Sequence, residues 1–379
     1  MERVLILGAG FGGLELATRL SDEVADGVDV TIIDRNDAFV FGFSKLDVMF
    51  GREDLDAVRL RYRDIVKPSV AVRQETVTAI DPNTRHVTTD RGEYDCDILV
   101  VALGADYAPE ATPGLLEGGG HEFYSVAGAA AARSVVDGFR GGDVIIGVLG
   151  PFFKCPVAPF ETAIMLHDRF VTRGVRDATT ITILSPMGAP IPISPTASEA
   201  ILAACGERGI EFHASTVVTG LDPGTNTATL HDGGTVRYDL FLAVPVHKAP
   251  DVVVASGLAV DGWIPVDPST FATSFPGVYA VGDVTSAPVP RAGVIAEGEA
   301  GTVADVLVAR IRDGEAPGPY QGRAACYMEF GGPDVARFDM DFLGGPVPTG
   351  EFVAPSPAIA EEKRRFGAVR RRRWFGLES

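Results

Sequence analysis

Short aliphatic runs alternate along the chain with stretches whose apolar residues recur at helical spacing. The aliphatic runs predict strands at 3–7, 28–33, 97–103, 143–149, 180–184, 239–244 and 277–281. The stretches between them predict helices at 14–21, 127–139, 160–173, 198–208 and 293–312. Because strands and helices alternate, the sequence predicts an α/β protein with parallel sheets.

The alternation falls into two sets, and the pattern changes to alternating strands and a basic helix beyond residue 320. Each set predicts a Rossmann-like dinucleotide-binding domain, and the last segment predicts a small α+β C-terminal domain. We expect a first domain at 1–108 and 239–319, with strands 239–244 and 277–281 returning to its sheet. A second, degenerate domain is expected at 109–238, and the C-terminal domain with its basic tail at 320–379.

A glycine-rich turn follows the first predicted strand and opens the first helix. It reads Gly8, Ala9, Gly10, Phe11, Gly12 and Gly13, and the next strand ends at Asp34 and Arg35. Glycines at this spacing permit a tight turn and let the backbone approach a pyrophosphate, which the helix N-terminus attracts. An acid about twenty residues later accepts hydrogen bonds from a ribose. The segment therefore predicts a dinucleotide site.

Two further segments narrow the dinucleotide to FAD. Ala102, Leu103 and Gly104 follow one buried strand, and Gly282 and Asp283 follow another. The three motifs in this order resemble the glutathione reductase-like flavoproteins with two dinucleotide-binding domains. The resemblance implies FAD, with Asp283 near its ribityl chain and the helix that begins at Ala292 and Gly293 near its flavin. In similar flavoproteins that bind the flavin covalently, a cysteine soon after the second strand makes the link; segment 39–43 contains no cysteine, so the resemblance implies a non-covalent FAD.

The second domain lacks the glycines that a nicotinamide cofactor requires. After strand 143–149 the sequence is Gly150-Pro151-Phe152-Phe153-Lys154-Cys155-Pro156-Val157-Ala158-Pro159-Phe160-Glu161. Prolines and phenylalanines stand where a pyrophosphate would need bare backbone. The sequence therefore argues against an ordinary NAD(P)H-dependent reductase.

The same segment carries a cysteine motif. Cys155 to Glu161, together with Cys326, resembles the sulfide:quinone oxidoreductases and flavocytochrome c sulfide dehydrogenases. The resemblance implies that hydrosulfide attacks a Cys155–Cys326 disulfide, leaving a persulfide on Cys155 and a thiolate on the flavin-proximal Cys326. Glu161 is a candidate proton relay, with stabilisation of its own helix as the alternative. Cys96 and Cys205 are interpreted as packing residues.

Charge limits the partners of the protein. The formal net charge of −18 opposes binding of nucleic acid. Seven basic residues between 363 and 373 are either a solvated tail or a peripheral contact with anionic lipid, helped by Phe366, Trp374 and Phe375. With no signal-peptide pattern and no membrane-spanning run, we expect a cytoplasmic protein, at most peripheral on the inner face of the membrane. The sequence leaves a homodimer open.

These observations favour an FAD-dependent oxidation of sulfide to sulfane sulfur, with a quinone as electron acceptor. The first alternative is an NADH:quinone dehydrogenase of the type II kind. The others are a flavoprotein that acts on another sulfur compound and a flavin-bearing binding subunit.

Overall fold

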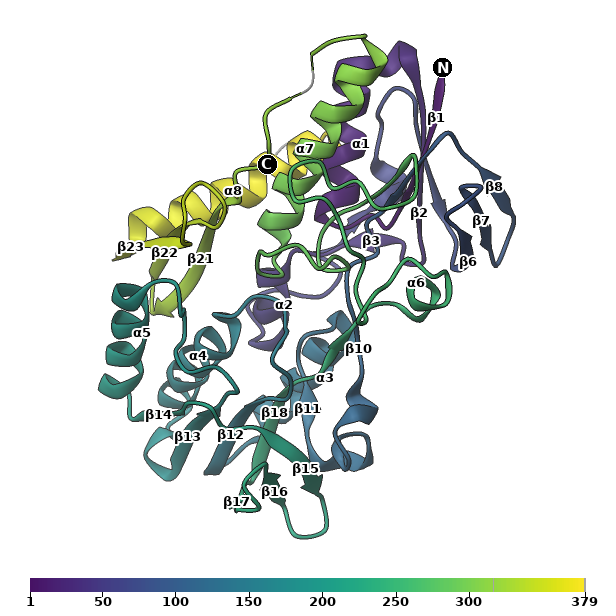
Figure 1. Ribbon diagram of the computed structural model, residues 1–379. Coiled ribbons are helices and arrows are strands. Elements are labelled where there is room, and N and C mark those ends of the chain that lie inside the picture. The colour runs from purple at the N-terminus through teal and green to yellow at the C-terminus, as the bar shows by residue number, and fades with distance from the viewer. Residues whose placement is uncertain (316, 378–379) are drawn as a thin grey trace.

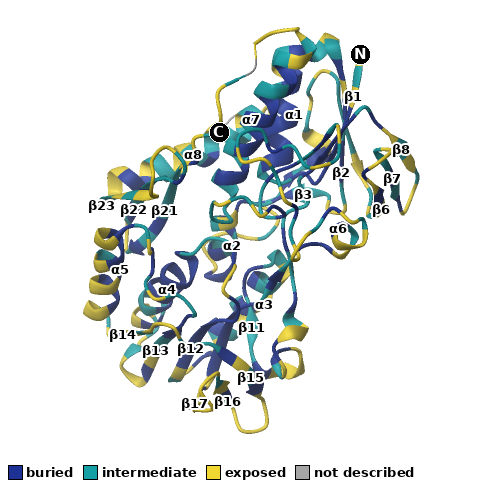
Figure 2. Ribbon diagram, viewed as in Figure 1, coloured by how far each residue is buried: buried dark blue, intermediate teal, exposed yellow. Residues whose placement is uncertain are grey.

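The computed structural model describes residues 1–315 and 317–377, so residue 316 and the last two residues of the predicted C-terminal domain lie outside it. A five-stranded parallel sheet forms the centre of the first domain (Figure 1). Its strand order is β20 (Val278–Ala280), β9 (Ile98–Val101), β1 (Glu2–Leu7), β2 (Val28–Asp34) and β5 (Val70–Gln74). The aliphatic runs form the buried inner strands, because both faces of a parallel sheet are covered (Figure 2).

Two long helices pack side by side on one face of this sheet (Figure 1). They are α1 (Phe11–Val24), which follows the glycine turn, and α7 (Gly293–Ile311). An antiparallel sheet at the side of the domain consists of β6 (Val77–Asp81), β7 (His86–Thr89) and β8 (Glu93–Asp95). The smaller elements are β3 (Ala38–Phe39), α2 (Gly42–Met49), β4 (Leu60–Arg61), β10 (Asp106–Tyr107), β19 (His247–Lys248) and α6 (Asp251–Ala255).

The second domain also has a five-stranded parallel sheet. Its order is β11 (His121–Glu122), β18 (Leu240–Val244), β12 (Gly142–Val148), β13 (Thr179–Leu184) and β14 (Ile210–His213). Its helices are α3 (Val126–Gly138), α4 (Ala158–Thr172) and α5 (Pro195–Glu207). A small antiparallel sheet contains β15 (Val218–Asp222), β16 (Thr227–Leu230) and β17 (Thr235–Arg237).

The expectation that strand 239–244 returns to the first sheet is wrong. β18 pairs with β12 and β11, so it belongs to the second sheet. All five of its residues are buried, and a wholly apolar strand fits the interior of either sheet equally well. We therefore propose a domain boundary after β18 in place of residue 239.

The C-terminal segment forms a three-stranded antiparallel sheet and a helix. They are β21 (Arg323–Gly331), β22 (Asp334–Asp341), β23 (Thr349–Ser356) and α8 (Pro357–Phe375). β21 contacts α4 of the second domain, and α8 contacts α1 of the first. The predicted α/β class, with two dinucleotide-binding domains and a small α+β C-terminal domain, is confirmed.

The basic tail packs on the folded core, and two of its three expected apolar anchors are buried. Trp374 and Phe375 are 1% and 3% exposed. The Trp374 indole donates a hydrogen bond to the buried Glu15 carboxylate over 3.0 Å, and Arg370 pairs with Glu297 over 2.8 Å. Since these aromatic side chains pack inside the first domain, they are not available to a lipid surface. In the described part of the chain, no helix is long and apolar enough to cross a bilayer.

Candidate functional site

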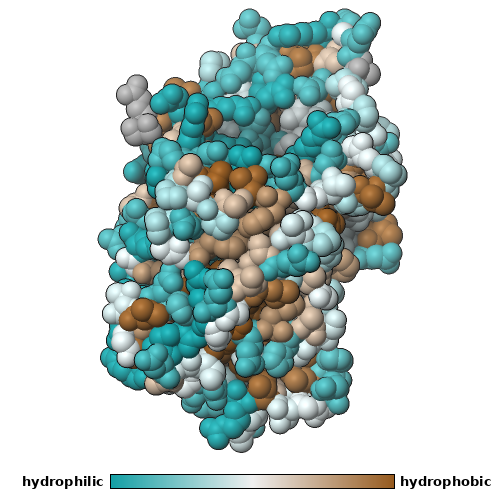
Figure 3. Space-filling model, turned by 90° about the vertical axis from the view of Figure 1, so that its left-hand side faces the viewer, coloured by the Kyte–Doolittle hydropathy of each residue, from teal (hydrophilic) through white to brown (hydrophobic). Residues whose placement is uncertain are grey.

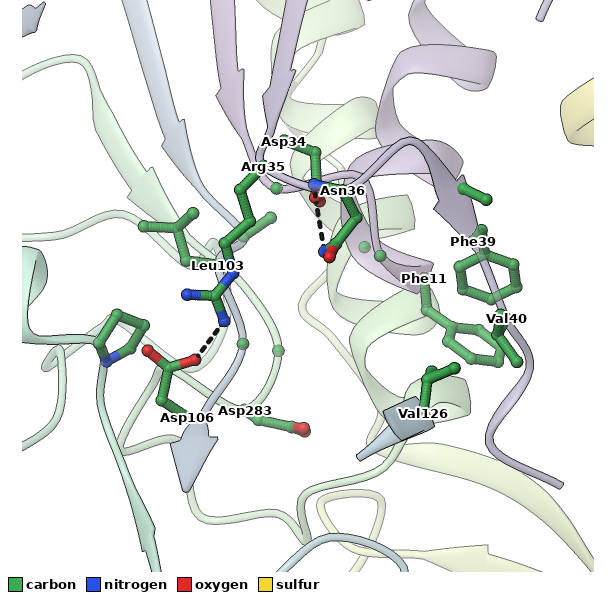
Figure 4. A pocket seen from close by; sticks show the side chains of 18 of the residues that line it. Phe11, Asp34, Arg35, Asn36, Phe39, Val40, Leu103, Asp106, Val126 and Asp283 are labelled. Carbon is green, nitrogen blue, oxygen red and sulfur yellow. Dashed lines mark hydrogen bonds and ion pairs between the residues drawn. The ribbon is translucent and has the colours of Figure 1, made fainter. Parts of the chain in front are cut away.

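A cleft of about 900 Å³ opens at the carboxyl ends of β1, β2 and β9, beside the N-terminus of α1 (Figure 4). Its walls include most of the predicted cofactor residues: Gly8, Gly10, Phe11, Gly12, Asp34, Arg35, Ala102, Leu103, Gly104, Gly282, Asp283 and Gly293. Gly13 and Ala292 are not among the lining residues. Gly13 packs behind the turn, where an added Cβ would lie 1.9 Å from the Gly8 carbonyl oxygen. Ala292 precedes the first residue of α7.

The glycine turn leaves room for an anion. Gly8 has a φ of +102°, and an added Cβ would lie 2.3 Å from the Ala102 carbonyl oxygen, so only glycine fits there. At Gly10, which precedes α1, an added Cβ would meet nothing within 4 Å and would project into open space. The free N–H groups of the fourteen-residue α1 therefore face the cleft, as pyrophosphate binding requires.

Asp34 is fixed at the end of β2 (Figure 4). One carboxylate oxygen accepts the Ala9 N–H over 2.8 Å, and the other accepts the Asn36 N–H over 2.8 Å. The second oxygen also accepts the Asn36 side-chain amide over 2.9 Å, so the oxygen that faces Ala9 keeps a lone pair for a ribose hydroxyl. Beside it, Arg35 pairs with Asp106 over 2.8 Å.

Asp283 presents an unused acceptor inside the cleft. Its Oδ1 atom is buried and has no hydrogen-bond partner within the described chain. Burial raises the pKa of Asp283, and the positive charges of Lys154 and Arg291 oppose the shift. A buried oxygen of this kind requires a donor from a ligand, and a flavin's ribityl hydroxyl is such a donor. The residues present therefore fit FAD: a pyrophosphate at the Gly8–Gly13 turn, a ribose at Asp34 and a ribityl chain at Asp283.

Cys155 lies in the loop that connects β12 to α4, and its backbone is held in a strained conformation. Its φ is +50°, which a non-glycine residue rarely adopts. The Cys155 N–H donates to the Arg291 carbonyl over 3.0 Å. The Cys155 carbonyl accepts the Ala158 N–H over 3.0 Å and the Tyr124 hydroxyl over 3.4 Å. A turn to Ala158 and contacts from two separate segments thus fix the backbone of Cys155.

A buried histidine holds the neighbouring residue. His247 Nε2 accepts the Lys154 N–H over 3.3 Å, and His247 Nδ1 donates to the Pro245 carbonyl over 2.8 Å. Burial, reinforced by the positive charge of Lys154, lowers the pKa of His247 to about 3. The imidazole is therefore neutral at physiological pH and carries its proton on Nδ1.

This histidine predicts a pH effect on stability. An unfolded histidine has a pKa near 6.5, so below that pH the unfolded chain binds a proton that the folded chain excludes until about pH 3. As the pH falls from about 6 to about 4, His247 should lower the free energy of unfolding by about 1.4 kcal/mol per pH unit. Urea titrations of His247→Gln should show a dependence of the unfolding free energy on pH that is shallower by this amount. The exposed His231→Gln is the control, and equal slopes for all three proteins would contradict the assignment.

Cys326 lies on β21 and interacts electrostatically with Cys155. Burial raises the pKa of Cys155 to about 12 and raises that of Cys326 further. After burial, the charge of Cys155 is the largest influence on the pKa of Cys326. The elements that carry the two thiols also adjoin, because α4, which follows the Cys155 loop, packs against β21. Both are in the free form, as are the buried Cys96 and Cys205.

Glu161 joins the two thiol-bearing elements. It lies in the first turn of α4, is 4% exposed, and its Oε1 accepts the Glu329 N–H of β21 over 3.0 Å. Lys363 of α8 approaches Glu161 to 3.6 Å and pairs with Glu329 at 2.6 Å. Burial raises the pKa of Glu161, and Lys363 opposes the shift. A carboxyl group in this position can hold a proton close to the thiols.

Most of the chain matches one known protein family. Residues 2–300 match the model of the pyridine nucleotide-disulphide oxidoreductases. The chain belongs to this family. It is accordingly an FAD-dependent oxidoreductase, and the expectation of FAD as cofactor is confirmed.

Individual relatives divide between two activities. The mitochondrial sulfide:quinone oxidoreductase of Mus musculus is 23% identical over 362 residues, which are 92% of this chain and 80% of that protein. The structure of sulfide:quinone oxidoreductase from Aquifex aeolicus superposes with a TM-score of 0.86 at 21% identity, covering 99% of this chain and 92% of that one. A type II NADH:quinone oxidoreductase of Staphylococcus haemolyticus is 38% identical over 112 residues, 27% of this chain and 26% of that protein.

The family name refers to a pyridine nucleotide, yet the second domain offers it a poor site. The N-terminus of α4 is buried at Ala158, Phe160 and Glu161. The N–H groups of Phe160 and Glu161 donate to the Val157 carbonyl over 3.1 and 3.0 Å, and Pro159 has none. This helix end therefore has few free donors for a pyrophosphate, which agrees with the prediction of a lost nicotinamide site.

Several residues around the site were not predicted from the sequence. Lys45 and Lys154 line the cleft, Tyr124 and His247 support the Cys155 loop, and Lys363 reaches Glu161. Of these residues, only Lys154 could have been found from the sequence, since it directly precedes Cys155 in the cysteine motif. The others belong to segments without a motif and reach the site through tertiary packing.

Proposed function

We propose that the protein oxidises sulfide to sulfane sulfur through Cys155 and Cys326 and passes the electrons through FAD to a quinone. The observation that carries the proposal is the packing of α4, which follows the Cys155 loop, against β21, which carries Cys326, so that two half-buried thiols from distant segments come from adjoining elements beside the flavin cleft. A binding subunit would not need this arrangement. The sulfide:quinone oxidoreductases named above support the same donor and acceptor.

The chemistry of the thiols can be written with atoms and electrons balanced. Hydrosulfide attacks the Cys155 sulfur of a Cys155–Cys326 disulfide, the S–S bond breaks, and a Cys155 persulfide anion, a Cys326 thiolate and one proton result. When bound, FAD supplies the acceptor for two electrons and a proton. Loss of these two electrons and transfer of the sulfane sulfur to a nucleophile restore the disulfide. Glu161 is the proposed carrier of the proton.

A quinone is apolar, so it requires an apolar surface by which to approach the site. Figure 3 shows the side of the molecule that carries α5 and the C-terminal sheet. Polar residues dominate the upper and lower parts of this side, and apolar residues gather between them. This band supports an approach of the quinone from this side of the molecule.

The second candidate is an NADH:quinone oxidoreductase. It is favoured by the 38% identity with the Staphylococcus haemolyticus enzyme, although that match spans only 112 residues. The buried N-terminus of α4 speaks against it, because a nicotinamide dinucleotide would have to displace Phe160 and Glu161.

An anaerobic absorbance titration distinguishes the two. We expect sodium sulfide to bleach the flavin of the holoprotein and to produce a long-wavelength charge-transfer band, and we expect NADH to do neither. Cys326→Ser should abolish the band, because the thiolate donor is missing. Rapid bleaching by NADH without a response to sulfide would replace the proposal by the NADH:quinone activity.

A further inference from the structure

The chain crosses between the first and second domains twice, and the two crossings lie side by side. The chain enters the second domain before β11 and leaves it after β18. β10, on the way in, pairs antiparallel with β19, on the way out, so that Tyr107 lies opposite His247 and Asp106 lies opposite Lys248 (Figure 1). The facing side chains of this short ribbon therefore belong to the junction of the two domains.

Three aromatic side chains pack together at this junction: Tyr107, Tyr124 and His247. The His247 ring meets the Tyr107 ring edge-to-face at a centroid distance of 4.9 Å and the Tyr124 ring at 5.7 Å. The Tyr107 hydroxyl donates to the Tyr124 carbonyl over 2.9 Å, and His247 Nδ1 donates to the Pro245 carbonyl over 2.8 Å. The ring of His247 is thus fixed, and its Nε2 atom remains as an acceptor.

This junction cluster holds the thiol loop at two consecutive residues. His247 Nε2 accepts the Lys154 N–H over 3.3 Å, and the Tyr124 hydroxyl donates to the Cys155 carbonyl over 3.4 Å. The Lys154 ammonium donates to the Ala105 carbonyl, directly before β10, over 2.7 Å. The backbone is therefore held on both sides of the Lys154–Cys155 peptide by residues of the junction.

The left-handed conformation of Cys155 depends on such contacts. A non-glycine residue keeps a φ of +50° only where its surroundings hold it, because its Cβ is crowded in this region. The Cys155 N–H is held as well, by the Arg291 carbonyl over 3.0 Å. Since the direction of the Cα–Cβ bond follows the backbone, a loop that relaxed to a negative φ would carry the sulfur to a different place.

We propose that His247 is a positioning residue for the Cys155 sulfur, because its Nε2 acceptor holds the thiol loop in the left-handed conformation and ties the sulfur to the domain junction. The inference rests on the proposed function, since it concerns the thiol that would carry the sulfane sulfur. His247 acts through the Lys154 backbone and forms no covalent bond in the reaction.

The test is the rate at which iodoacetamide alkylates Cys155 in the reduced holoprotein, in a Cys326→Ser background that leaves one thiol of the pair. The Cys155 thiolate displaces iodide and forms a thioether, and the peptide is quantified by mass spectrometry. All rates are measured at about pH 8, near the ordinary thiol pKa. Burial lowers the pKa of His247 to about 3, so the imidazole is neutral at this pH and neutral replacements leave the charge near the thiol unchanged.

The variants separate the acceptor from the ring. His247→Phe keeps a ring against Tyr107 and Tyr124 and removes the acceptor, and His247→Leu removes the acceptor with a smaller side chain. His247→Gln retains an acceptor at the position of Nε2. The matched control is His231→Phe, since His231 Nδ1 also accepts a backbone N–H, that of Val217 over 3.4 Å, on the exposed small sheet of the second domain.

We expect His247→Phe and His247→Leu to raise the alkylation rate of Cys155 by about tenfold, the order expected for the loss of one buried hydrogen bond. A shielded thiol reacts when its loop opens, and the unpaired Lys154 N–H makes opening easier. The rate for the buried Cys205 should not change, because the opening is local. His247→Gln and His231→Phe should keep the rate of the parent.

A second measurement links the loop to the thiol pair. With Cys326 restored, the protein is equilibrated with glutathione: the dithiol gives two electrons to glutathione disulfide, which yields the Cys155–Cys326 disulfide and two glutathione thiols. His247→Phe should shift this equilibrium toward the dithiol by at least about tenfold, because a displaced sulfur meets Cys326 less often. His247→Gln should not.

An unchanged alkylation rate of Cys155 in both His247→Phe and His247→Leu would overturn the inference. So would an equal rise for Cys205, which would indicate global destabilisation, or an equal rise in His247→Gln, which would indicate packing. Faster alkylation with an unchanged glutathione equilibrium would equally overturn it, because the pairing with Cys326 would not depend on His247. If the parent formed no disulfide, the proposed function would fail while the alkylation rates still decided the inference, so the two failures are distinguishable.

Discussion

Cys155→Ser should abolish reduction of the flavin by sulfide. A serine hydroxyl forms neither a disulfide with Cys326 nor a persulfide, so both sulfur-transfer steps lose their carrier. We expect the rate of anaerobic flavin bleaching to fall by at least about 10³-fold, as when a side chain that takes part in the chemical step is removed. Stopped-flow absorbance of the holoprotein at a fixed sulfide concentration measures it.

The matched control is Cys205→Ala, since Cys205 is 1% exposed in α5 and lies apart from the flavin cleft. Its bleaching rate should equal that of the parent protein. Retention of sulfide-dependent bleaching in Cys155→Ser, with normal FAD content, would show that sulfide reduces the flavin without the thiol pair.

Trp374→Ala should destabilise the protein by about 3–5 kcal/mol, the usual loss for a buried aromatic side chain. Trp374 packs edge-to-face on Phe11 and Phe39 at centroid distances of 5.6 Å, and its indole donates to Glu15. Phe11 lines the flavin cleft, so FAD affinity should fall as well. Urea unfolding and FAD release, both followed by fluorescence, measure the two effects.

Arg372→Ala on the exposed face of α8 is the control and should leave stability and FAD affinity unchanged. If this segment contacted lipid instead, the Trp374→Ala substitution would affect vesicle binding and not stability. If Trp374→Ala kept full stability but lost binding to anionic vesicles, the helix would be a membrane anchor and its described packing would be misassigned.

The parts of the site that depend on local sequence could be predicted. The glycine turn, Asp34 and the Gly282–Asp283 motif each lie at the end of a predicted strand, and the local geometry at each position requires that residue type. The structure brings them into one cleft. The lack of a glycine-rich turn after β12 is also a feature of the local sequence. Such features depend on residues a few positions apart, where spacing alone fixes the geometry.

The parts of the fold and the site that depend on tertiary packing could not be predicted from the sequence. β18 is apolar throughout, so its sequence does not say which sheet it enters. The arginines near Trp374 resemble a solvated tail, although Arg370 pairs with Glu297 far away in the chain. Lys45 reaches Tyr124, and Tyr124 reaches Cys155, only through long-range contacts, for which single residues carry no pattern.

The position of α8 has a consequence for the order of events during synthesis. Trp374 belongs to the last turn of α8, and it completes the aromatic packing around Phe11 of α1. On the ribosome, the amino-terminal sheet can form early, yet its cofactor cleft lacks this support until α8 has emerged. We therefore expect a nascent chain that ends before α8 to hold FAD weakly, so that stable flavin incorporation follows the synthesis of this helix.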